Sequence, residues 1–565
     1  MLKKIIFVCL IVCLAAYGIN AYMQRRQLEE NYTAMGYAPE IKTTRQIPAD
    51  ADFGAYLAGL LAKESQDWPR ALRYFERALE KDPENKDLQF SIYLMRVSSG
   101  EIEKALPLAQ ALVKEKQSEL MPDYVLIIDH IQKKNYGDAL AQLDKKPKHV
   151  LDFMLKPMVR TWILAGMGER EKALKELEKI KAKEPLISLY WYHRGLLGLF
   201  FKDDALADES FKKLNETGMP TSSAYAQMIP FYQNRNEWNV FNVLYNDFQA
   251  LVFEKPFIGD LIGQMLKTKM NTAQSFLAEG LYNLAIPVQS SENIAALMLN
   301  SMALYLSPDH VMAVLFEAEI FEGMKMYERA NYFYKTIPNP SDTVLLKQAL
   351  SYRFLGKNDT ALTILLKLAQ NRPQDPLIYK LIGDIYQEQG NKAKGIEYYA
   401  RAIKLVRSPQ ELSVLYLLRG NLYELQGQSK KAEADFLVAL NLDIENPVLL
   451  NDIGYRWLEQ DKNLPQAVSM VKKAYAVDPE NPYYIDSMAM AFYKQKEYEK
   501  AVTYSERATD MLPYSAVVNM NLGDIYLALG RRREAGYQYQ KALNLKTDLT
   551  PALEEALKKK ITAID

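Results

Sequence analysis

Residues 59–85 read GLLAKESQDWPRALRYFERALEKDPEN. Positions 8, 20, 24, 27 and 32 of a 34-residue unit fall on Gly59, Ala71, Phe75, Ala78 and Pro83. Small residues at positions 8, 20 and 27 suit the crossing of two antiparallel helices, where a larger side chain would push the helices apart. Proline at position 32 ends the second helix, because proline cannot continue it. The stretch therefore predicts a pair of packed helices.

The same spacing recurs far along the chain. Three later units repeat the pattern. One has Ala349, Ala361, Leu365, Leu368 and Pro373 at the same five positions, and the other two have Gly420, Ala432, Phe436 and Ala439, and Gly523, Ala535, Tyr539 and Ala542, at the first four, with Tyr423 and Tyr526 at position 11. One unit alone would leave an apolar face exposed, so the units must stack to bury a continuous core. The pattern resembles the tetratricopeptide repeat over roughly nine-tenths of the chain. It predicts an all-α, right-handed superhelical solenoid of antiparallel helix pairs.

The repeats divide the chain into regions. We expect a signal peptide or membrane anchor at 1–22, a linker at 23–50, an N-terminal array at 51–220, an irregular helical segment at 221–276, a C-terminal array at 277–549 and a capping helix at 550–565. The irregular segment has helical periodicity but no clean repeat. A polar cap is expected because the last unit of a solenoid would otherwise expose its apolar face.

The N-terminus is typical of an exported chain. Two lysines precede an apolar run from Ile5 to Ala16, as in a secretory signal peptide. Cleavage after Gly18 and retention as an anchor both remain open, since an apolar stretch of this length is close to the minimum for spanning a bilayer. Lipid attachment at Cys13 is a third alternative, although valine rather than a small residue precedes it.

Composition excludes several classes of function. Lys+Arg and Asp+Glu both number 70, so the chain has no overall basic footprint for nucleic acid. The two cysteines, Cys9 and Cys13, both lie in the N-terminal segment. The main body therefore has no thiols for a disulfide framework or for thiolate chemistry.

The sequence contains no recognisable catalytic motif. The four histidines are His130, His149, His193 and His310, and no two have the i, i+4 spacing of a helical metal site. None stands beside a suggestive cluster of carboxylates, and no phosphate-binding loop or dinucleotide fingerprint occurs. We therefore expect no enzymatic activity, no metal and no cofactor.

A partner protein is expected on the concave side of the solenoid, which the first helix of each unit lines. The candidate contact residues are Asp384, Asn421, Asn451, Tyr455, Tyr483, Asp486, Tyr493 and Asp524. An acidic groove with asparagines suits an extended peptide backbone or a basic protein surface. The alternative, that some of these residues only pack against the next unit, stays open.

The last repeats resemble those of a proteobacterial envelope family. The marks are N-x-x-G-Y from Asn451 to Tyr455, D-P-E-N-P from Asp478 to Pro482, and L-G-D-x-Y from Leu522 to Tyr526; Met488 to Met490 depart from the usual Leu-Gly-Trp. Members of that family are usually periplasmic outer-membrane lipoproteins, and one is the adaptor of a carboxyl-terminal processing protease. The resemblance implies a periplasm-facing scaffold that holds a protein, such as an envelope protease or its substrate. The alternative is a structural component of a secretion, polysaccharide-export or cell-envelope assembly machine.

Overall fold

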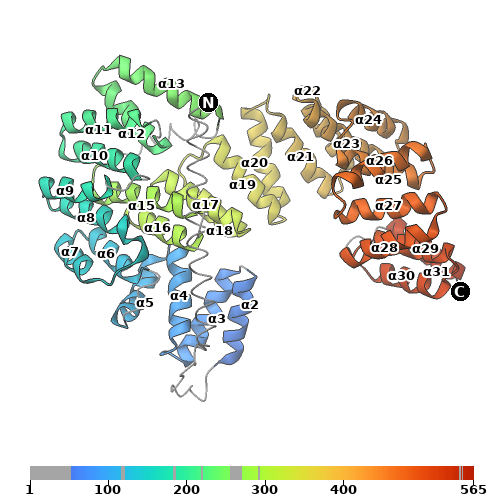
Figure 1. Ribbon diagram of the computed structural model, residues 1–565, viewed down its shortest axis with the longest axis horizontal. Helices are drawn as coiled ribbons and strands as arrows, with labels where there is room; N and C mark the ends of the chain where they lie inside the picture. The colour runs from blue at the N-terminus through green and yellow to red at the C-terminus, as the bar shows by residue number, and fades with distance from the viewer. Residues whose placement is uncertain are drawn as a thin grey trace. The chain divides into compact units, whose positions relative to one another are not determined.

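The computed structural model describes residues 52–65, 67–115, 121–181, 186–217, 220–254, 270–289, 293–545, 549 and 551–564. The predicted signal or anchor and the predicted linker lie outside these residues, as do residues 255–269 of the segment predicted to be irregular. Every regular element in the described residues is a helix, and most consecutive helices pack as pairs (Figure 1). The predicted all-α solenoid of helix pairs is confirmed.

The chain forms two compact units that divide after Lys357. The elements of unit 1 are α2 (Phe53–Glu64), α3 (Trp68–Lys81), α4 (Lys86–Ser98), α5 (Ile102–Lys114), α6 (Pro122–Gln132), α7 (Tyr136–Lys145), the 3-10 helix η1 (Val150–Phe153), α8 (Leu155–Gly166), α9 (Arg170–Lys181), α10 (Ile187–Phe201), α11 (Asp204–Glu216), α12 (Ser222–Asn234), α13 (Trp238–Glu254), α15 (Ala273–Gln289), α16 (Asn293–Leu306), α17 (Val311–Gly323), α18 (Tyr327–Thr336) and α19 (Asp342–Phe354). Helices α12 and α13 and the first residues of α15 lie in the described part of the segment predicted to be irregular.

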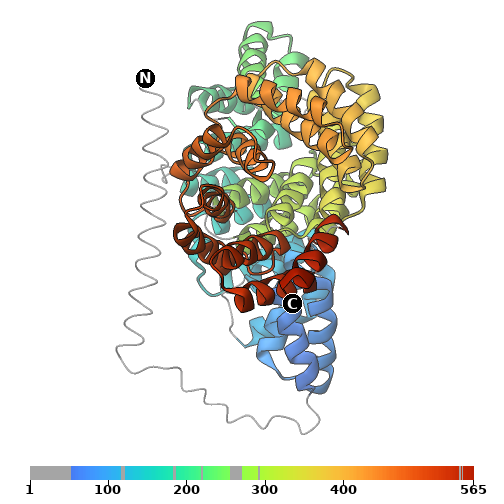
Figure 2. The same cartoon turned by 90° about the vertical axis from the view of Figure 1, so that its right-hand side faces the viewer.

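Unit 2 is a regular stack in which the helices follow one another in chain order (Figure 1 and Figure 2). Its helices are α20 (Asn358–Asn371), α21 (Pro376–Glu388), α22 (Lys392–Leu405), α23 (Pro409–Leu425), α24 (Ser429–Leu442), α25 (Pro447–Glu459), α26 (Leu464–Val477), α27 (Pro482–Lys494), α28 (Tyr498–Met511), α29 (Ala516–Ala528), α30 (Arg532–Asn544) and α31 (Pro551–Ile564). The last helix, α31, packs against α30 at the end of the stack.

Local sequence explains where the helices begin and end. Gly390, Gly427 and Gly530 separate the two helices of their pairs and have φ values of +73°, +73° and +79°, a conformation that glycine adopts without strain. At the start of α27, Asn481 caps the helix by accepting a hydrogen bond from the backbone N–H of Tyr483 at 3.0 Å. Pro482 follows at the first helical position, where its missing N–H costs no hydrogen bond.

Each typical pair is held at one close crossing, between a glycine of the first helix and an aromatic ring of the second. A Cβ atom added to Gly383 would lie 2.7 Å from the ring of Tyr399, and one added to Gly420 would lie 2.6 Å from the ring of Phe436. Real Cβ atoms do not approach so closely, so a side chain at either glycine would force the helices apart. The glycine therefore sets the separation of the pair.

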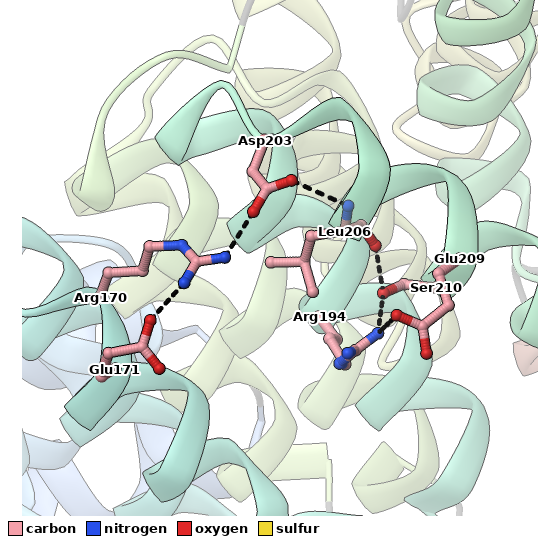
Figure 3. Close-up of polar contacts among 7 residues, drawn as sticks. All are labelled: Arg170, Glu171, Arg194, Asp203, Leu206, Glu209 and Ser210. Carbon is pink, nitrogen blue, oxygen red and sulfur yellow. Dashed lines mark hydrogen bonds and ion pairs between the residues drawn. The ribbon is translucent and has the colours of Figure 1, made fainter.

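Polar contacts link consecutive pairs in unit 1 (Figure 3). The carboxylate of Asp203 caps α11 by accepting the N–H of Leu206 at 3.0 Å. The same carboxylate forms an ion pair with Arg170, which lies at the start of α9 one pair earlier. The Leu206 hydrogen bond and the Arg170 ion pair hold the pKa of Asp203 below its usual range. The Asp203 side chain thus caps α11 and links it to α9 of the preceding pair.

Unit 1 folds back on itself. Helix α15 packs against α8 and α10, and α16 packs against α4, α5 and α6, so both lie inside the arc that runs from α4 to α12 (Figure 1). The ring of Trp162 on α8 stacks on Phe276 of α15 at 5.0 Å between centroids, and Tyr305 of α16 donates a hydrogen bond to Asp129 of α6 at 2.9 Å. These contacts place α15 to α19, the start of the predicted C-terminal array, in the same compact unit as α2 to α13. The inner side of unit 1 is occupied by its own helices.

The crossing in the last complete pair predicts opposite effects for two glycine substitutions. A Cβ at Gly523 would overlap the ring of Tyr539, whereas a Cβ at Gly536 would meet nothing within 4 Å. We expect Gly523→Ala to lower the free energy of unfolding by about 1–3 kcal/mol through overpacking. Gly536→Ala should raise it by up to about 1 kcal/mol, because alanine favours the helix. Denaturant unfolding of both variants tests this, and equal stabilisation by both would refute the role given to the crossing.

The double role of Asp203 can be separated by two substitutions. Asparagine is as good a helix cap as aspartate but cannot form the ion pair, whereas alanine loses both interactions. We expect Asp203→Ala to lower the midpoint of thermal unfolding more than Asp203→Asn does, with the wild type the most stable. Equal losses in both variants would mean that the cap contributes nothing measurable.

Candidate functional site

The first helices of successive pairs line the inner side of unit 2. Helix α25 contacts α27, and α27 contacts α29, whereas no two successive second helices in the described residues make comparable contact. Helices approach more closely on the inner side of a curved stack than on its outer side. The face formed by α21, α23, α25, α27 and α29 is called the inner face below.

All eight predicted contact residues lie on helices of the inner face. They are Asp384 on α21, Asn421 on α23, Asn451 and Tyr455 on α25, Tyr483, Asp486 and Tyr493 on α27, and Asp524 on α29. Their side chains differ in what they contact and how far they are exposed. Whether any of them binds a partner stays a prediction.

Two of the predicted carboxylates are engaged within their own helix pair. Asp384 accepts a hydrogen bond from the hydroxyl of Tyr399 at 2.8 Å and forms an ion pair with Lys380 at 2.9 Å. Asp524 accepts the corresponding hydrogen bond from Tyr539 at 2.5 Å. Each carboxylate therefore holds the tyrosine ring that fills the crossing of its pair. Packing within the repeat therefore explains why an aspartate stands at these two positions.

Two other predicted residues are brought together by a third that sequence reasoning did not single out. The side-chain amide of Asn521 on α29 donates hydrogen bonds to the hydroxyl of Tyr455 at 2.9 Å and to Oδ2 of Asp486 at 3.0 Å. Tyr455 on α25 thus reaches past α27 to α29, two pairs along the stack. Burial, assisted by the charge of Glu459, raises the pKa of Asp486 to about 7 despite the Asn521 hydrogen bond. Burial also raises the pKa of Tyr455.

The remaining four predicted residues do not form a cluster with these. The side-chain carbonyl oxygens of Asn421 and Asn451 are buried and have no hydrogen-bond partner in the described part of the chain. Tyr493 is half-buried with its ring 5.7 Å from that of Tyr498. Tyr483 is largely exposed. Of the eight residues, Tyr483 offers the most surface to a partner.

Tyr483 belongs to an apolar row that the predicted set left out. Leu377, Val414, Val448 and Tyr483 occupy the same position in four successive first helices, and their exposed fractions are 46%, 37%, 51% and 61%. These four side chains are called the apolar stripe below. The sequence signal was present, because an apolar residue recurs at the second position of each repeat.

Unit 1 contains a buried acid–histidine pair that the sequence did not reveal. His310 on α17 lies 2.8 Å from Glu279 on α15, which also accepts a hydrogen bond from Asn283 at 2.6 Å. Burial acts to raise the pKa of Glu279, but these hydrogen bonds outweigh it and hold the pKa below its usual range. The two residues are 31 positions apart, so only the packing of α15 against α17 brings them together.

The space beside this pair is small. A cavity of about 30 Å³ is lined by Glu279, His310 and Ser223, among others. Such a volume accommodates a water molecule rather than a substrate. His193 lies nearby, and burial lowers its pKa to about 4, so that the ring stays neutral and accepts a hydrogen bond from Trp162 at 3.2 Å. The arrangement serves to hold the inner helices of unit 1.

The described residues offer neither a metal site nor a membrane-spanning helix. No group of three or more histidine, cysteine, aspartate or glutamate side chains there is arranged to hold a metal ion. None of the helices described between residues 52 and 564 has both the length and the apolar character needed to cross a bilayer.

Comparison with known proteins identifies the repeats. A family model described as tetratricopeptide repeat matches residues 56–119, 346–411 and 487–553. None of the curated proteins compared matches the sequence significantly. The repeat assignment is therefore carried by the family model and by the helix pairs.

Several solved structures resemble the chain weakly. The APC/C hetero-tetramer Cut9-Hcn1 matches 90% of this chain and 96% of its own, with 15% identity and a TM-score of 0.37. Yeast Tom70 matches 90% of this chain and 95% of its own, with 13% identity and a TM-score of 0.35. A tetratricopeptide repeat protein from Parabacteroides merdae matches 45% of this chain and 98% of its own, with 17% identity and a TM-score of 0.36.

The buried carboxyl of Asp486 predicts a pH dependence of stability. Its pKa is raised on folding from about 3.9 to about 7, so its contribution to stability is fully present below pH 4 and is lost as the pH rises through 7. We expect Asp486→Asn to gain stability relative to the wild type between pH 5 and pH 8, by up to a few kcal/mol. Denaturant unfolding at both pH values measures this.

The matched control is Asp510→Asn, at an exposed aspartate on α28. This variant should keep the pH profile of the wild type. An Asp486→Asn profile parallel to that of the wild type would contradict the burial of an ionisable group at this position.

Proposed function

We propose that this chain, a tetratricopeptide-repeat protein, is a noncatalytic scaffold that holds a protein partner on the inner face of unit 2. Proteins of this repeat class are typically scaffolds, and their repeats mediate protein–protein interactions. One observation carries the proposal. The inner side of unit 1 is filled by α15 and α16, whereas the inner face of unit 2 presents the exposed apolar stripe.

The chemistry of the inner face favours a protein as its ligand. An exposed row of large apolar side chains loses unfavourable contact with water when a partner covers it. At the repeat positions predicted to face the groove, Glu388, Glu424 and Glu459 reach the surface, whereas Asp384 and Asp486 are buried. The lysines at these positions, Lys380 and Lys494, are each engaged by an aspartate. An acidic surface repels phosphates, so a nucleic acid is disfavoured and a basic protein surface is favoured.

The proposed location is the periplasm, with attachment to a membrane through residues 1–22. Support comes from the sequence alone: the basic and apolar N-terminal segment, and the lack of cysteine beyond Cys13. The resemblance of the last repeats to an envelope family points to an envelope protease, or its substrate, as the partner held.

Site-specific photocrosslinking in intact cells tests the scaffold role. A photoreactive phenylalanine analogue replaces Tyr483 on the inner face or, as control, Tyr537 on α30, which is also largely exposed. Both analogues retain an aromatic ring at a surface position, so the fold should be unchanged. We expect a defined protein to crosslink at position 483 and not at 537.

Two results would contradict this proposal. The absence of any protein crosslink at position 483 would remove the inner face as a binding site. Equal capture of secretion or polysaccharide-export machinery at both positions would instead favour the alternative, a structural component of an assembly machine.

A further inference from the structure

A cavity in unit 2 opens at the start of α21 and α23. It has a volume of about 510 Å³, and its walls include Leu377, Lys380, Val406, Glu411, Val414 and Asn446. That volume lies within the range of binding pockets for small ligands, so the cavity can accept one or two side chains of a partner. It is called the α21–α23 pocket below.

The pocket continues into the apolar stripe. Leu377 and Val414 belong to both, and Val448 and Tyr483 extend the row onto α25 and α27. Leu377 and Val414 line one pocket, and where first helices pack directly on each other, as α25 does on α27, their axes lie about 8–10 Å apart. Three residues of an extended chain cover roughly the same distance, at about 3.1 Å per residue. An extended partner segment with an apolar side chain at every third residue therefore matches the spacing of the stripe.

The charged groups of the pocket are not equally available. The ammonium group of Lys380 is engaged by Asp384 at 2.9 Å, and Lys494 farther along the inner face is engaged by Asp461 at 2.8 Å. Glu411 lies in the first turn of α23 at the pocket wall and is exposed. A cation on the partner can therefore pair with Glu411, whereas an anion would meet no uncommitted lysine in the pocket.

The polar wall of the pocket is largely satisfied by the chain itself. Asn446 caps α25 by accepting the N–H groups of Val448 at 3.0 Å and Leu449 at 3.3 Å. Its amide also donates to Asp443 at 3.0 Å. Apolar contact, Glu411 and the exposed side-chain amide of Gln410 are therefore the features left for recognition.

We propose that the α21–α23 pocket binds an extended segment of the partner protein in which aliphatic side chains recur every third residue beside a lysine or arginine. One aliphatic side chain enters between Leu377 and Val414, the next lies against Val448, and the cation pairs with Glu411. This inference rests on the proposed scaffold function and adds the chemistry by which the partner is recognised.

A phage-displayed library of random dodecapeptides, selected on the full-length purified protein, tests this recognition. Enriched peptides should carry aliphatic residues at i and i+3 with an adjacent lysine or arginine. Their binding should fall at least tenfold in Val414→Arg, which fills the pocket with a cation. The matched control is Val438→Arg on α24, at a valine of similar exposure on the second helix of the same pair, and it should bind like the wild type.

Charge reversal at Glu411 is the second part of this peptide-selection experiment. Selection on Glu411→Lys should keep the aliphatic spacing but replace the basic residue with aspartate or glutamate. The proposal is overturned if no peptide is enriched, if enriched peptides bind Val414→Arg as well as Val438→Arg, or if the charge preference does not change. Thermal unfolding of each variant excludes loss of fold as the cause.

The outcome can be separated from that of the scaffold proposal. If the crosslink at position 483 forms in the wild type and persists in Val414→Arg, the scaffold stands and the pocket inference fails. If neither the wild type nor Val414→Arg forms a crosslink at position 483, the scaffold proposal itself fails.

Discussion

The close crossing of a glycine and an aromatic ring is the contact on which the repeats depend. This contact sets how near the two helices of a pair lie, as at Gly383 against Tyr399, Gly420 against Phe436 and Gly523 against Tyr539. With that distance fixed, the apolar faces of neighbouring pairs meet at a constant spacing and can be buried in one continuous core. Where the ring is a tyrosine, as in Tyr399 and Tyr539, its hydroxyl requires an acceptor, which Asp384 and Asp524 supply. The inner face is therefore acidic partly for reasons of packing.

The two units are built from the same kind of helix pair but differ in what covers their inner side. In unit 1, α15 and α16 lie against α4, α6, α8 and α10, and the burial of Glu279 is made tolerable by His310 and Asn283. A buried charge of this kind is acceptable only when hydrogen bonds replace the lost water. In unit 2 the side chains of the apolar stripe stay exposed on the inner face, and this contrast with unit 1 underlies the proposal that unit 2 holds the partner.

The eight predicted contact residues lie on the helices that the repeat register assigns to them, but their surroundings differ. Position within the repeat correctly put all eight residues on first helices of unit 2. The position within the repeat did not distinguish a side chain that is free to contact a partner from one that is already hydrogen-bonded within the protein. Asp384 and Asp524 accept hydrogen bonds from tyrosines of their own pairs. Asp486 and Tyr455 both accept hydrogen bonds from Asn521. Tyr483, in contrast, is exposed to solvent. Hydrogen-bond partners 15 to 66 residues away decide these differences, and no local pattern contains them.

The sequence by itself determined the helix pairs, their stacking and the absence of recognisable catalytic motifs, because these depend on residues within one 34-residue period. Spacing of small, aromatic and proline residues dictates a local geometry that repeats wherever the pattern recurs. Only the tertiary structure decided that α15 and α16 fold back into unit 1, that His310 meets Glu279, and that the α21–α23 pocket stays open. Each of these depends on contacts between helices distant in sequence, where many packings satisfy the same local pattern and the total buried surface selects one.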